Sequence, residues 1–256
     1  MSVSNASAVM FFFYGFSAFM LTLIMLQRMY KNPKSSSFLL VLSRIGVIIL
    51  TFGTTCDNFR IFAGCFTNFN VYNSANKAVT WFCTLGHEIL AAVAIATPCQ
   101  FMQKAIENEK SKMYMEYIAY LAPILFGIIG ISGLALSLPA ELVEKTTCSD
   151  IGQPIKMLHP ESDSSTALIS VFAWTFAMIT SGWFLCKKYK WKRIWAVFFV
   201  INICCLFGQG LLPALGPVYK CYGSNFWEQV AFATAVWADY ELNVKELQSL
   251  LSSQDE

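Results

Sequence analysis

ASAVMFFFYGFSAFMLTLIMLQ, from Ala6 to Gln27, contains no charged residue, and neither does the stretch from Tyr117 to Ala140. About 20 apolar helical residues cross a bilayer hydrocarbon core about 30 Å thick, and both stretches reach that length. Apolar types make up 56% of the chain and charged types only 13%, against roughly a quarter charged in ordinary globular domains. A soluble fold needs more charge to cover its surface, so we expect one polytopic α-helical membrane domain.

Six apolar runs predict membrane-spanning helices, near residues 8–27, 38–55, 78–102, 114–138, 166–186 and 194–218. A seventh run, 225–240, carries Glu228 and Asp239 near its ends. The helix between these acids is only about 15 Å long, too short to span with both acids in water. Either the acids face the bundle interior, or the segment lies on the interface as an amphipathic helix. We therefore expect an all-α bundle with seven spans, or with six spans and an interfacial helix.

Lys and Arg accumulate on the cytoplasmic side of membrane proteins, so their distribution predicts orientation. The first, third and fifth loops contain Arg28, Lys31, Lys34, Lys104, Lys110, Lys112, Lys187, Lys188, Lys190, Lys192 and Arg193. The second, fourth and sixth contain only Arg60, Lys77, Lys145, Lys156 and Lys220. No Lys or Arg precedes the first run, unlike in a cleavable signal peptide. We expect the N-terminus outside, a membrane domain over residues 1–240 and a cytoplasmic tail over 241–256.

Four of the nine cysteines fall on the predicted outer side: Cys56, Cys65, Cys148 and Cys221. An even set of cysteines on an oxidising side can form disulfides, so we expect at least one bridge among these four. The alternative is that they are free thiols that pack as small apolar residues.

Ionisable residues inside a membrane are costly and mark candidate sites. If the second helix continues past residue 55, Asp57 and Arg60 lie one turn apart, at i and i+3. His87 and Glu88 fall near the middle of the third run, at a similar predicted depth. We expect an outward-facing polar pocket. Its candidate ligand-binding residues are Asp57, Asn58, Arg60, His87, Glu88, Gln209 and Glu228.

The alternative to a pocket is an internal ion-pair network that only fixes helix packing. Arg44 lies near the inner end of the second run, and we interpret it as a side chain that reaches the interface along the helix. Gly127, Gly130 and Gly133 predict a packing seam on the fourth run, because glycine allows close helix approach. The Gly/Pro-rich segment 208–217 predicts an unwound helix that either lines a cavity or simply ends.

Several chemistries are excluded by residue counts. The chain has two histidines, too few for di-iron, three-histidine zinc or bis-histidine two-haem sites. His87 and Glu88 are adjacent, so their side chains point about 100° apart on a helix and cannot form a zinc-binding face. No nucleotide-binding or hydrolase motif occurs. The net charge of +2 is too small to suggest nucleic acid. We expect no metal, no cofactor and no catalytic residue that the sequence identifies.

A seven-span, N-outside arrangement resembles receptors and rhodopsins only in topology, which does not give function. The absence of a mid-span lysine argues against a retinal protein. The favoured function is binding or transport of a small polar ligand or lipid headgroup. The alternatives are a membrane assembly or trafficking factor, and a lipid-modifying enzyme with His87 as general base. The basic segment 187–193 is topogenic or attracts anionic inner-leaflet lipid. The expected partner is the bilayer, in either the plasma membrane or the endomembrane system.

Overall fold

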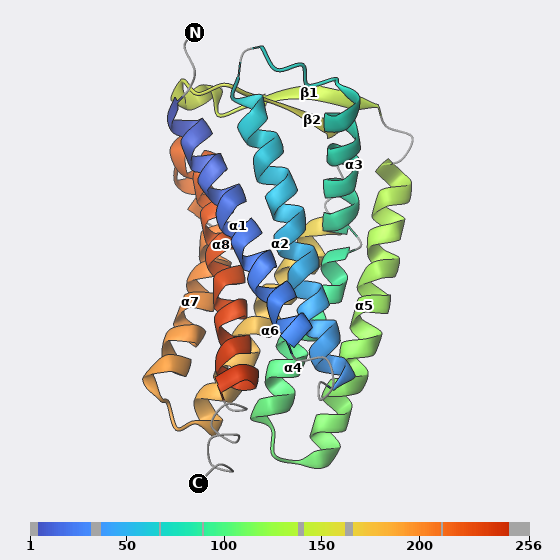
Figure 1. Ribbon diagram of the computed structural model, residues 1–256, viewed down its shortest axis with the longest axis vertical. Coiled ribbons are helices and arrows are strands. Elements are labelled where there is room, and N and C mark those ends of the chain that lie inside the picture. Colours follow the sequence, from blue (N-terminus) through green and yellow to red (C-terminus); the bar gives the residue numbers. More distant parts are fainter. Residues whose placement is uncertain are drawn as a thin grey trace.

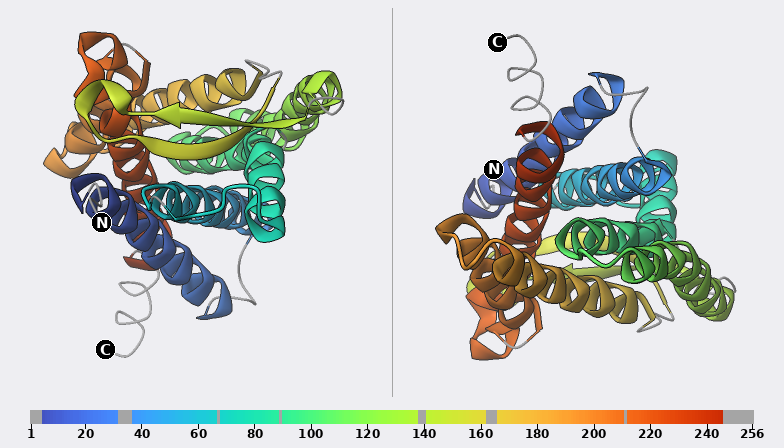
Figure 2. Two further views of the ribbon diagram at one scale, coloured as in Figure 1. Left: turned by 90° about the horizontal axis from the view of Figure 1, so that it is seen from above. Right: turned by 90° about the horizontal axis from the view of Figure 1, so that it is seen from below.

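The computed structural model describes residues 5–31, 37–66, 68–88, 90–137, 141–161, 166–210 and 212–245. In these residues the chain forms eight α-helices and a two-stranded β-hairpin. The helices run along the long axis of the molecule, and the hairpin lies across one end of the bundle (Figure 1; Figure 2, left). Helix α1 begins at the hairpin end, and α8 ends at the opposite end (Figure 1).

Four helices in the described residues are long and apolar enough to cross a membrane: α1 (Asn5–Lys31), α2 (Phe38–Gly64), α5 (Glu109–Ser137) and α7 (Arg193–Gly210). Helices α1 and α5 each contain about 20 consecutive uncharged residues, enough to cross a bilayer core, whereas α2 is equally long although it carries Arg44, Asp57 and Arg60. The predicted helical membrane bundle is confirmed to this extent. Helix α2 continues past residue 55 through Asp57 and Arg60, as expected, because apolar residues surround those charges.

The predicted third span, 78–102, is broken into α3 (Ser74–Glu88), a 3-10 segment η1 (Leu90–Ile95) and α4 (Ala96–Ala105). Pro98 explains the break, because its ring clashes with the carbonyl four residues earlier, at Ala94, in a continuous α-helix. Segment η1 packs directly on α2 at Gly46. A Cβ atom at Gly46 would lie 2.6 Å from the Cα atom of Ala94, so the close approach requires glycine there.

Helix α5 lies at the edge of the bundle (Figure 2, right). Only 11% of its most apolar stretch is buried. A Cβ atom at Gly127 would meet no other atom within 4 Å, so no helix packs closely there. The predicted glycine packing seam is therefore wrong at this position. The exposed side chains of Leu121, Ile124 and Ile128 are suited to contact with lipid instead.

The hairpin was not predicted, so the all-α expectation is incomplete. Strand β1 (Leu142–Thr147) pairs antiparallel with β2 (Ile155–Pro160), with Leu142 opposite Pro160. A short 3-10 turn, η2 (Ser149–Ile151), joins them. Ile155 is fully buried, and a Cβ atom at Gly64 would lie 2.1 Å from the Lys156 carbonyl oxygen. The hairpin therefore rests directly on the end of α2.

The disulfide prediction is confirmed for one pair. Cys148, at the hairpin turn, is bonded to Cys221, and their Cα atoms are 5.5 Å apart. The other two candidates, Cys56 and Cys65, are free thiols and do not form a second bridge. Their places on α2 explain this, since Cys56 lies within the helix and Cys65 caps its end. The bridge fastens the hairpin to α8.

The last three helices are α6 (Thr166–Lys188), α7 and α8 (Pro217–Asp239). The predicted sixth span, 194–218, is too long, because α7 ends at Gly210 and is followed by the 3-10 segment η3 (Leu212–Leu215). Gly216 has a φ angle of 153°, and Pro217 occupies the first turn of α8. The Gly/Pro segment is thus a helix end and a restart. The predicted seventh helix, 225–240, starts earlier than expected.

Candidate functional site

The ion pair near the hairpin end comes from a single turn of α2. The Arg60 Nη2 atom donates to Asp57 Oδ1 at 2.5 Å, as the i, i+3 spacing predicts. The Nη1 atom of Arg60 donates to the Leu158 carbonyl of β2 at 2.7 Å and to Thr80 Oγ1 of α3 at 3.2 Å. One buried guanidinium thus joins α2, α3 and the hairpin.

Asn58 lies beside this ion pair and faces the interior. Its side chain is 1% exposed, and its Nδ2 atom donates to the Thr54 carbonyl at 2.9 Å. Its Oδ1 atom has no hydrogen-bond partner among the described residues. Thr54, one turn along α2, donates to Glu228 Oε1 at 3.4 Å and so links α2 to α8. Glu228 faces the bundle interior, as one of the two sequence interpretations expected.

Gln229, next to Glu228, is a buried polar residue that the sequence interpretation missed. Its Oε1 atom accepts a hydrogen bond from Ser17 Oγ of α1 at 3.1 Å. Its Nε2 atom has no partner within the described part of the chain. A second contact, from Thr22 to Thr51 at 2.8 Å, joins α1 to α2 further from the hairpin. Together these contacts form a polar seam between α1, α2 and α8, defined here by Ser17, Thr22, Thr51, Thr54, Asn58, Glu228 and Gln229.

The remaining candidates are not joined as clearly. His87 and Glu88 belong to the last turn of α3, and their side chains lie outside the described part of the structure. Gln209 is half-buried on the last turn of α7. Asp57, Asn58 and Arg60 thus lie on neighbouring positions of α2, and Thr54, one turn away, contacts Glu228 of α8. The ligand-binding role of all seven candidates stays a prediction.

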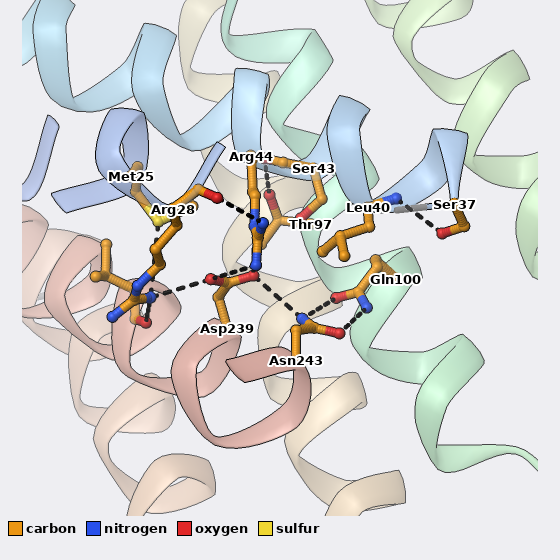
Figure 3. A network of polar contacts seen from close by, with 11 residues as sticks. Met25, Arg28, Ser37, Leu40, Ser43, Arg44, Thr97, Gln100, Asp239 and Asn243 are labelled. Atoms are coloured by element: carbon orange, nitrogen blue, oxygen red, sulfur yellow. Dashed lines mark hydrogen bonds and ion pairs between the residues drawn. The ribbon is translucent and has the colours of Figure 1, made fainter. Parts of the chain in front are cut away.

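A second charged cluster lies at the end opposite the hairpin, and Figure 3 shows its side chains pointing toward one carboxylate. Asp239 of α8 accepts from Arg44 Nε at 3.1 Å and from Arg28 Nη1 at 3.0 Å. Arg44 is 1% exposed and Asp239 2%. Arg44 also donates to the Arg28 carbonyl, while Arg28 donates to the Val236 carbonyl at 2.6 Å. The interpretation that Arg44 reaches the interface is therefore wrong, because an inward carboxylate holds it.

Two amides extend this cluster to α4. The chain after α8 forms a π-helical turn, η4 (Tyr240–Val244), and Asn243 Nδ2 donates to Asp239 Oδ1 at 3.1 Å. Gln100 Nε2 of α4 donates to Asn243 Oδ1 at 3.1 Å (Figure 3). Single π turns inside helices often occur at functional sites. We call Arg28, Arg44, Gln100, Asp239 and Asn243 the inner cluster; it joins α1, α2, α4 and α8.

No protein family matches the chain, and no curated protein is similar to it. Within the described residues, no three His, Cys, Asp or Glu side chains are grouped so that they could hold a metal ion. The geometry of the polar seam and of the two ion clusters therefore carries the functional argument.

Proposed function

We propose that this chain is a seven-span integral membrane protein that binds a small polar ligand in its outer half, between α1, α2 and α8. The observation that carries the proposal is the pair of buried amides, Asn58 and Gln229, each with one polar atom that has no hydrogen-bond partner among the described residues. Leaving a buried donor or acceptor unpaired costs about 1–3 kcal/mol. A polar ligand that hydrogen-bonds to these atoms would remove that cost, as would water in the absence of the ligand.

The unpartnered atoms have complementary character. Asn58 Oδ1 is an acceptor, whereas Gln229 Nε2 is a donor. The Glu228 carboxylate, which accepts a hydrogen bond from Thr54 of α2, adds a negative charge to the seam. A ligand with both donor and acceptor groups, such as a hydroxyl, amide or zwitterionic compound, matches this set better than an apolar one. A binding protein and a transporter would both need these donor and acceptor groups to recognise the ligand.

The same proposal assigns the topology. The seven crossings would be α1, α2, the interrupted segment α3–η1–α4, α5, α6, α7 and α8, with the hairpin end outside. Irregular backbone at membrane depth is tolerated where it is buried in protein, and the close approach of α2 to η1 at Gly46 supports placing this break within the bilayer. The excess of Lys and Arg in the odd loops supports this orientation.

Reporter fusions test the topology. A reporter fused after Glu256 should be cytoplasmic, and a reporter inserted between residues 141 and 165 should be outside, because an odd number of spans separates the two positions. Activity of a compartment-specific reporter in intact cells measures this. If both reporters are on the same side, α6, α7 and α8 do not make three crossings and the seven-span arrangement fails.

Accessibility of an introduced thiol tests the ligand site. Gln229→Cys should be labelled by a charged, membrane-impermeant thiosulfonate applied from outside, because a polar ligand site must be open to water. Mass spectrometry of the intact protein counts the added groups against the unsubstituted chain, whose own free cysteines set the background.

Ala235→Cys is the matched control. Ala235 lies on the same helix, is fully buried and belongs to the apolar core, so its thiol should stay unlabelled. Equal labelling of both variants would indicate general opening of the bundle. If neither is labelled, the seam is only a packing device, and the proposed ligand site is lost.

A further inference from the structure

An apolar groove of about 530 Å³ follows one face of α6. It is lined by α6 residues between Phe172 and Thr180, by Met102 of α4 and by Leu206 of α7. Ala173 and Ala177 explain the hollow, because their small side chains leave space between the larger Phe172 and Phe176. The groove belongs neither to the polar seam nor to the inner cluster.

The groove leads along α6 to the basic segment. Phe172, Phe176, Thr180, Trp183 and Lys187 follow at spacings of three or four residues and so share one helix face. The Nζ atom of Lys187 lies 5.0 Å from the centre of the Trp183 ring. This face therefore changes from apolar to aromatic to cationic toward the end of the helix, which is the order of layers from the bilayer core to the headgroups.

The two lysines at this end carry uncompensated charge. Lys188 Nζ donates to the Lys104 carbonyl, the last turn of α4, at 2.6 Å. Neither Lys187 nor Lys188 forms an ion pair with a described residue. Both side chains are exposed. Two ammonium groups on the last turn of α6, toward which the apolar groove leads, are complementary to an anion that carries a hydrocarbon chain.

We propose that this groove binds an anionic phospholipid of the inner leaflet, with its phosphate on Lys187 and Lys188 and one acyl chain against Ala177. Half of the hydrocarbon core is about 15 Å thick, the rise of about ten helical residues. Ten residues separate Lys187 from Ala177, so Ala177 lies at about the bilayer midplane. A chain that starts at the lysines enters the groove at Thr180, about 10 Å from Lys187 along the helix. The inference rests on the proposed seven-span arrangement for α6, and it does not involve the polar ligand.

Lipid titration by native mass spectrometry tests the site. The protein is delipidated in a neutral detergent and titrated with phosphatidylglycerol or with phosphatidylcholine of the same acyl chains. Phosphatidylglycerol should bind more tightly. Lys187→Gln with Lys188→Gln should weaken its binding about 30-fold, which is about 1 kcal/mol for each lysine at 1.4 kcal/mol per decade.

The control removes the same charge from the same loop. Lys190→Gln with Lys192→Gln should change phosphatidylglycerol binding no more than about threefold, since those residues lie beyond the end of α6. Ala177→Phe, which fills the groove, should weaken binding of both lipids while the lysines remain in place. Its melting temperature shows whether the variant is folded, and Ala177→Leu serves as a milder substitution if it is not.

Three outcomes overturn the proposal. The two lysine pairs could weaken binding equally, which would indicate attraction to the whole basic loop. Ala177→Phe and Ala177→Leu could both leave lipid binding unchanged, which would place the acyl chain elsewhere. The two lipids could bind alike to the unsubstituted protein, which would remove the role of charge. In each case labelling of Gln229→Cys would still decide the polar ligand site, so the two proposals fail separately.

Discussion

Asp239→Ala should lower the free energy of unfolding by about 3–5 kcal/mol, because it leaves the buried guanidinium of Arg44 without a counter-charge. Asp239 accepts hydrogen bonds from two arginines and one amide, from α1, α2 and η4. Removing the carboxylate should therefore weaken the packing of α1, α2 and η4 together. Thermal unfolding of the purified protein in detergent, followed by loss of the monodisperse peak in size-exclusion chromatography, measures the effect.

Glu109→Ala provides the matched control for removal of a carboxylate. Glu109 pairs with Lys112 at 2.7 Å, but its side chain is 83% exposed, so the loss should be about 0.5 kcal/mol or less. The double variant Arg44→Leu with Asp239→Leu should be more stable than Asp239→Ala, since it removes the buried guanidinium together with its counter-charge and leaves only Arg28, whose side chain is 16% exposed, without the carboxylate. If Asp239→Ala were as stable as Glu109→Ala, the inner cluster would contribute little to the fold.

The second large effect concerns the disulfide. Cys148→Ser should reduce stability by about 4 kcal/mol at a sequence separation of 73 residues, because the cross-link restricts the unfolded chain. The bridge also fastens the hairpin to α8, and Arg60 bonds to that hairpin at Leu158. The hairpin end should therefore become more accessible to protease in this variant. Thermal unfolding and limited proteolysis, each with and without reductant, measure the two effects.

Cys204→Ser provides the control, because Cys204 is a half-buried free thiol, and its loss should cost about 1 kcal/mol or less.

Under native conditions Cys65 should also resist alkylation, since burial raises the pKa of its thiol to about 11. The bridge is therefore mapped after denaturation without reductant. If Cys148 and Cys221 were then both alkylated, the bridge would be absent from the protein.

Of the seven residues of the polar seam, the sequence predicted only Asn58 and Glu228, and it predicted them as isolated residues. The pairing of Asp57 with Arg60 followed from local helix geometry, since residues at i and i+3 meet whatever the fold. Glu228 was recognised as an acid in an apolar run, but its neighbour Gln229 was not, because nothing in the local sequence shows on which face of the helix an amide is buried. Its contact with Ser17 depends on how α1 packs against α8.

The ion pair of Arg44 was also beyond what the local sequence could predict. Near the end of a span, an arginine that reaches the interface and an arginine bound to a buried acid have the same sequence pattern. The choice between them depends on Asp239, which is 195 residues away in sequence. No local rule connects those two positions. The π turn that brings Asn243 to the same carboxylate is likewise set by packing.

The sequence by itself determined the mostly helical fold, the presence of helices apolar enough to cross a membrane and the positions of most helices, because these depend on the local density of apolar residues. Tertiary structure alone decided which cysteine pairs with Cys148, where the hairpin rests, and which charges meet inside the bundle. These outcomes depend on close approach of segments far apart in the chain. Such approach is set by three-dimensional packing, which has no periodic signature in the sequence.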